Sequence, residues 1–147
     1  MKGFVVYDSN FGNTKIVAES IARQLGGNVK AVSVRRIKDA DLEGIDLLVV
    51  GSPINAWSPT SPTKKFLEGL GKDGLAGIKA AAFDTRLRSF ASGDAAKNIS
   101  RALKRAGAKI IAKPTGFYVK GTKGPLLEGE TSRATDWADE IRSGAGL

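Results

Sequence analysis

The 147-residue sequence contains no cysteine and no histidine. The absence of thiols excludes disulfides, a thiol nucleophile and a cysteine-bound iron–sulfur cluster, and the absence of both residue types excludes zinc sites of the usual kind. Histidine acid–base chemistry is excluded as well. Any difficult chemistry must therefore come from carboxylates or from a bound cofactor.

Long hydrophobic runs are also absent. No apolar stretch approaches the roughly 20 residues that a membrane-spanning helix needs, and the start of the chain lacks the pattern of a secretory signal peptide. A hydrophobic content of 41% over 147 residues is sufficient for one domain with a real core. We therefore expect a single domain spanning residues 1–147, cytoplasmic, without a membrane partner.

Acidic residues are scarce in the middle of the chain. Residues 75–127 hold 11 basic and 2 acidic side chains, whereas residues 1–74 hold 10 and 8, and the whole chain carries a net charge of +8. Such a basic region suits an acidic partner protein, or it is simply a solvated surface. No aromatic residues interleave with the basic ones as a base-stacking platform requires, so specific nucleic-acid binding is not expected.

The most informative stretch lies near the start. The apolar run 4–7 predicts a buried strand, and Val17, Ile21 and Leu25 recur at the four-residue spacing of a helix. Short polar residues at 8–14 connect the two elements. The first N–H groups of a helix lack internal partners and attract anions, so this turn is a candidate phosphate site. The alternative is an ordinary turn in which Asn13 or Thr14 only caps the helix.

This turn does not match the two common nucleotide-binding patterns. It lacks the Gly-Lys-Ser/Thr ending of a P-loop, and Gly12 is its only glycine, which excludes the pattern G-x-G-x-x-G.

The rest of the chain alternates strand and helix patterns. Buried strands are predicted at 47–51 and 78–83, an edge strand at 28–34, and a last strand at 109–119 that Pro114 interrupts. Helices follow most of these strands, with a short helical turn at 39–44. This order predicts an α/β fold with a doubly wound, five-stranded parallel sheet.

Two further loops follow strands on the edge of the sheet where ligands of open α/β folds bind. Residues 52–62 contain three prolines and no periodicity, which predicts a stiff loop, and Trp57 within it offers a flat ring. Residues 84–90 form the third predicted loop. Phe90 is either a second stacking ring or a core residue.

The segment Tyr7-Asp8-Ser9-Asn10-Phe11-Gly12-Asn13-Thr14 resembles the phosphate loop of the flavodoxin family, Ser/Thr-x-Thr-Gly-Asn-Thr, in its variant with an aromatic residue before the glycine. The segment after the strand at 47–51 is also similar to the flavin-contacting loop of that family. The resemblance implies the strand order 2-1-3-4-5, a short-chain form and non-covalent binding of FMN. It implies the following site residues: Ser9, Asn10, Phe11, Gly12, Asn13 and Thr14 at the phosphate; Ser52, Pro53, Ile54, Asn55, Ala56 and Trp57 at the ring; Thr85, Arg86 and Leu87 at the pyrimidine edge.

The function that the resemblance implies is an FMN-binding electron carrier that serves a redox partner protein, here an acidic one. Arg86 would place positive charge beside reduced FMN and make the protein less reducing than acidic flavodoxins. Two alternatives stay open. One is an NAD(P)H-dependent flavin or quinone reductase in which Arg86 and Arg88 hold the nucleotide's phosphates, and the other is a regulatory domain that no longer binds FMN.

Overall fold

The computed structural model describes residues 1–55, 57–88 and 93–146. Its strands are β1 (Lys2–Tyr7), β2 (Asn28–Ser33), β3 (Leu47–Asn55), β4 (Ser58–Pro59), β5 (Lys79–Leu87), β6 (Lys109–Ile110) and β7 (Thr115–Val119). Its helices are α1 (Asn13–Leu25), α2 (Ser61–Glu68), α3 (Ala95–Arg105) and α4 (Glu130–Gly144), with a 3-10 turn, η1, at Asp39–Leu42. Ala56 and Phe90 lie outside the described residues, so the expectations for them stay predictions.

The sheet has the predicted parallel order. Its path is β2-β1-β3-β5-β6, and β7 pairs in parallel with the further half of β5. The fifth position of the sheet is therefore shared by β6 and β7, which confirms a last strand interrupted near Pro114. Because strands 1 and 3 are neighbours while strand 2 lies outside them, the order along the sheet reverses beside β1, where such folds bind ligands.

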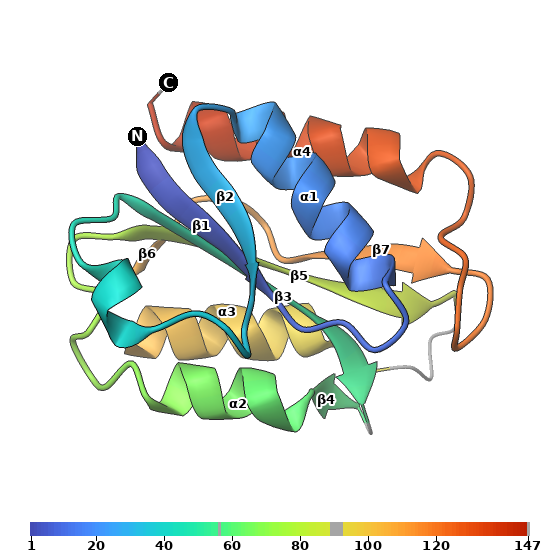
Figure 1. Cartoon of the computed structure of the whole chain (residues 1–147), viewed down its shortest axis with the longest axis horizontal. Helices are drawn as coiled ribbons and strands as arrows, with labels where there is room; N and C mark the ends of the chain where they lie inside the picture. Colours follow the sequence, from blue (N-terminus) through green and yellow to red (C-terminus); the bar gives the residue numbers. More distant parts are fainter. Residues whose placement is uncertain (56, 89–92, 147) are drawn as a thin grey trace.

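Helices cover both faces of the sheet: α1 and α4 lie on one side, and α2 and α3 on the other (Figure 1). The central strands are continuously apolar because both of their faces are buried. Val49 and Phe83 pack toward α1 and α4, whereas Leu48 and Ala82 pack toward α3. Two apolar layers thus hold the carboxyl ends of β1, β3 and β5 at one edge.

The layer beneath α4 contains an aromatic cluster. Phe83, Phe117 and Trp137 meet pairwise edge to face, with ring centroids 5.9–6.1 Å apart. Trp137 is 3% exposed, so it belongs to the core. Gly51 lies against the Phe83 ring, and a Cβ atom at that position would overlap the ring. The central strand therefore needs glycine just before it reaches the predicted ligand-binding edge.

Two predicted loops are strands instead. Strand β3 continues to Asn55, and β4 folds back on it as an antiparallel pair that joins Asn55 with Ser58, so the prediction of an irregular loop at 52–62 was wrong for this part. Strand β5 continues through Thr85, Arg86 and Leu87, because β7 pairs with this stretch along its full length.

The described residues contain no helix that combines the length and the apolar character needed to cross a membrane.

Candidate functional site

A cavity of about 400 Å³ opens at the carboxyl ends of β1, β3 and β5. It is lined by most of the predicted site residues: Ser9, Asn10, Phe11, Asn13, Thr14, Pro53, Ile54, Trp57, Thr85, Arg86 and Leu87. The volume lies within the usual range for small-molecule sites. Segments far apart in the sequence thus meet where the parallel topology predicts.

Three described residues of the predicted set do not line the cavity: Gly12, Ser52 and Asn55. Ser52 is fully buried, and its hydroxyl donates to the carbonyl of Pro53 and accepts from the N–H of Thr60. Its contribution is to fix the backbone that carries the lining residues.

The cavity also includes Val119 and Thr122, which sequence reasoning missed. Val119 ends the fifth parallel strand, so the rule that ligands bind at carboxyl ends would have pointed to it.

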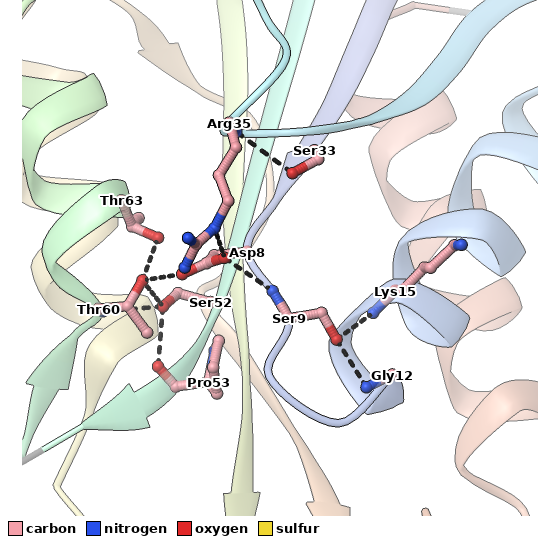
Figure 2. A network of polar contacts seen from close by, with 10 residues as sticks. All are labelled: Asp8, Ser9, Gly12, Lys15, Ser33, Arg35, Ser52, Pro53, Thr60 and Thr63. Atoms are coloured by element: carbon pink, nitrogen blue, oxygen red, sulfur yellow. Dashed lines mark hydrogen bonds and ion pairs between the residues drawn. The ribbon is translucent and has the colours of Figure 1, made fainter.

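The loop between β1 and α1 is held by Ser9. The Ser9 hydroxyl oxygen accepts from the N–H of Gly12 at 3.0 Å and from that of Lys15 at 3.4 Å (Figure 2). Gly12 is the N-cap of α1 with φ of 94°, a left-handed conformation that favours glycine. The N-cap residue is thus Gly12, which has no side chain, so the interpretation of Asn13 or Thr14 as the cap was wrong.

The N–H groups of this loop point to an anion. Within the described residues, the backbone N–H groups of Asn10, Phe11, Asn13 and Thr14 have no hydrogen-bond acceptor. Because Asn13 and Thr14 begin α1, their N–H groups also lie at the positive end of the helix dipole. This set of donors suits a phosphate group.

Asn13 is positioned by a glycine of a distant loop. Gly124 has φ of 99°, and a Cβ atom there would lie 2.6 Å from Oδ1 of Asn13. The segment that follows β7 therefore closes against the β1–α1 loop, and glycine at 124 leaves room for the Asn13 side chain.

A buried carboxylate anchors the same loop to α2. Asp8, 1% exposed, accepts from the N–H of Ser9 at 3.0 Å, from Oγ1 of Thr60 at 2.6 Å and from Nε of Arg35 at 3.3 Å (Figure 2). Thr60 immediately precedes α2, so one acidic side chain fixes the start of this loop relative to the opposite helical layer. On the other side, Oγ1 of Thr14 lies 2.8 Å from Oγ1 of Thr85 in β5.

Arg86 is clamped between two carboxylates. Its Nε and Nη2 atoms donate to the two carboxylate oxygens of Asp84 at 2.7 and 2.5 Å, and Nη2 also donates to Asp94 at 3.0 Å. The side chain passes over Gly116, where a Cβ atom would overlap the guanidinium group. Burial raises the pKa of Asp84, against the lowering effects of the hydrogen bonds from Arg86 and the N–H of Ala96. The hydrogen bond to Asp84 raises the pKa of Arg86.

Large apolar side chains surround the cavity and remain accessible. Phe11 is 52% exposed, Trp57 59% and Leu87 39%. Trp57 has φ of 71°, a conformation that is costly for a bulky side chain and that tends to occur at functional sites. Exposed apolar groups around a concave site indicate a ligand with a large apolar surface.

A doubly wound sheet with a helix-terminal anion loop, an aromatic hairpin and a cavity between them defines a protein of the flavodoxin class. The chain belongs to this family, because residues 4–125 match the family model for the flavodoxin domain. The predicted resemblance and fold class are thus confirmed.

Known structures share this fold. A flavodoxin from the domain Archaea superposes with a TM-score of 0.85 at 22% identity, over 100% of both chains. Flavodoxin 1 from Bacillus cereus has a TM-score of 0.83 at 17% identity, over 97% of this chain and 98% of that one. Rubredoxin oxygen:oxidoreductase from Desulfovibrio gigas contains a similar domain, with a TM-score of 0.81 at 20% identity over 99% of this chain and 36% of that one. Family membership supports flavin-dependent electron transfer as the general role.

Proposed function

We propose that this protein binds FMN non-covalently in the cavity at the ends of β1, β3 and β5 and carries electrons to a redox partner. The observation that supports this most strongly is the pairing of two features at one cavity: backbone N–H groups without acceptors at one part, and exposed Phe11, Trp57 and Leu87 at the rest. A ligand with a phosphate group and a large flat ring satisfies both.

The phosphate would be held by the loop that begins with Ser9. Its donors are the N–H groups of Asn10, Phe11, Asn13 and Thr14, together with the Asn13 amide. Because the hydroxyl of Ser9 accepts two N–H groups of its own loop, it also has a proton to donate toward the cavity. A loop already fixed by Ser9 and Asp8 loses little further entropy when an anion binds.

The ring would lie among the apolar residues that line the rest of the cavity. FMN, when bound, supplies the capacity to accept and release one or two electrons. The role of the chain is to orient it: Trp57 and Phe11 offer aromatic faces, and Leu87 and Val119 exclude water.

The proposal changes the expected role of Arg86. With both carboxylates ionised, Asp84, Arg86 and Asp94 together carry one net negative charge, so the cavity wall is not a cationic surface. The expectation of a less reducing protein than acidic flavodoxins therefore loses its electrostatic basis. Arg86 instead holds the end of β5 in place for a ligand.

Titration of the protein with FMN tests the proposal, with flavin fluorescence and calorimetric heat as readouts. We expect quenching and heat release. Asn13→Asp places a negative charge beside the phosphate donors and should weaken FMN binding about tenfold or more, while binding of riboflavin, which has no phosphate, changes little. Asn28→Asp, the same change at an exposed residue that begins β2, is the matched control.

If FMN keeps its full fluorescence and releases no heat, the proposal is refuted. The hypothesis of a regulatory domain that no longer binds FMN then remains. The reductase alternative gains no support from the predicted nucleotide cations: Arg86 is paired, and the guanidinium group of Arg88 lies 5.9 Å from the Tyr118 ring. Steady-state oxidation of NADPH by the FMN-loaded protein tests that alternative.

A further inference from the structure

A second concave surface also borders the β3–β4 hairpin. It is a groove of about 560 Å³ between α2 and α3, the two helices that cover one face of the sheet side by side (Figure 1). Ser58 and Pro59 of β4 form one end of its lining. No residue that we assign to FMN binding lines this groove.

The groove combines an apolar floor with a rim of three cations and one carboxylate, Glu68, so its net charge is positive. Leu67 and Ala102 on the facing helices supply half-buried apolar surface, and Lys64, Lys72 and Arg105 stand exposed around it. In the described part of the chain, none of these three cations takes part in an ion pair. They are therefore available to a partner without first breaking an internal contact.

The surface around the groove is also positively charged. Helix α3 exposes Lys97, Arg101 and Lys104 in addition to Arg105. Residues 128–147, which include α4 on the far side of the sheet, hold five acidic and two basic side chains. A partner with a negative surface is consequently steered toward the α2–α3 side rather than toward α4.

We propose that the α2–α3 groove is the docking site for an acidic segment of the redox partner, with apolar side chains that enter the groove. Charge complementarity selects the acidic segment, and the floor at Leu67 and Ala102 accepts its apolar groups. Among the described residues, the groove lining contains no aromatic side chain on which bases stack, which disfavours single-stranded nucleic acid.

The position of the groove links docking to electron transfer. Ser58 and Pro59 follow Trp57 directly, and Trp57 lines the candidate FMN cavity. A segment bound in the groove would therefore contact residues that directly follow a residue of the proposed flavin site. This link rests on the proposed function, whereas binding of the segment itself does not.

The test uses a fluorescein-labelled amphipathic peptide of about 14 residues, with glutamates on one face and leucines on the other, and measures fluorescence anisotropy. We expect the peptide to bind the protein with and without FMN. Its affinity should fall about tenfold or more between 20 and 300 mM salt. Lys64→Glu/Arg105→Glu should weaken binding about tenfold or more. Arg23→Glu/Lys30→Glu changes the net charge equally at exposed residues outside the groove and should weaken it less than about threefold.

Two comparisons test the apolar part. Ala102→Gln fills the groove without changing the charge and should weaken peptide binding several-fold. A peptide whose leucines are replaced by serines should bind the wild-type protein several-fold more weakly than the original peptide. Equal weakening by both charge-reversal variants, or no effect of Ala102→Gln and of the serine peptide, would overturn the proposal in favour of non-specific attraction. Tighter binding of single-stranded DNA of the same charge, reduced by Lys64→Glu/Arg105→Glu, would overturn it in favour of nucleic acid. Since the unloaded protein is tested too, failure of FMN binding and failure of docking give different results.

Discussion

Replacing Arg86 by methionine should destabilise the protein in a strongly pH-dependent way. Methionine keeps an apolar stem over Gly116 but removes the guanidinium group from Asp84, whose side chain is fully buried. The N–H of Ala96 then remains as a donor to that carboxylate. Removing one partner of a buried ion pair costs about 3–5 kcal/mol when the other charge stays buried.

Proton uptake by Asp84 limits this cost. From the ordinary pKa of 3.8, protonation at pH 7 costs about 4 kcal/mol, and at pH 5 it costs less than about 2 kcal/mol. Burial raises the pKa of Asp84, so both values are upper limits. A folded-state pKa above the unfolded value means that falling pH favours the folded state through this group, and that this contribution disappears as pH rises through the folded pKa. The loss in Arg86→Met should therefore be large at pH 7 and small at pH 5.

Urea unfolding of the wild type, Arg86→Met and Asp84→Asn/Arg86→Met at both pH values measures these differences. The double variant removes the uncompensated charge, so at pH 7 it should exceed Arg86→Met in stability by most of the cost of the single change. At pH 5 the two variants should differ by less than about 2 kcal/mol. An equal cost of Arg86→Met at both pH values, or a double variant no more stable than the single one at pH 7, would refute the reasoning.

Three further predictions concern the frame of the site. Gly51→Ala should lose about 1–3 kcal/mol in urea unfolding because its Cβ overlaps the Phe83 ring, and Phe83→Leu in the same chain should recover part of that loss; strict additivity would contradict this. Trp57→Gly should be more stable than Trp57→Ala by about 1 kcal/mol in thermal or urea unfolding, since φ at this position is 71°; equal midpoints would show that the conformation is not costly. Thr14→Val should cost about 1–3 kcal/mol, because it leaves the buried Thr85 hydroxyl without its 2.8 Å partner, and adding Thr85→Val should lower that cost; a further loss would contradict the pairing.

The elements that the sequence predicted are those with unambiguous apolar patterns. The run 47–50 specifies a strand buried on both faces, and the spacing of Val17, Ile21 and Leu25 specifies a helix packed on one face. Once a parallel sheet is accepted, the carboxyl ends of β1, β3 and β5 must share one edge. This is why residues from three distant segments could be assigned to one cavity.

The features that sequence reasoning missed depend on partners that lie far away in the sequence. Strand β5 continues through charged residues because Asp94 and Asp84 neutralise Arg86 and because β7 pairs beside them. Strand β4 has two residues, too few for any periodicity to show. The left-handed N-cap at Gly12 replaces a side-chain cap, and glycine alone gives no signal that separates the two.

The hairpin of β3 and β4 carries part of the cavity lining outside the buried sheet. Trp57 is carried by a two-stranded extension of the central strand, so its place is set by Asn55 and Ser58 rather than by a long connecting segment. Exchanging Trp57 would change which side chain lines the cavity, while the buried part of β3 stays unchanged. Substitutions at Trp57, Ser58 and Pro59 can therefore change the lining of both concave surfaces without altering the buried strands of the sheet.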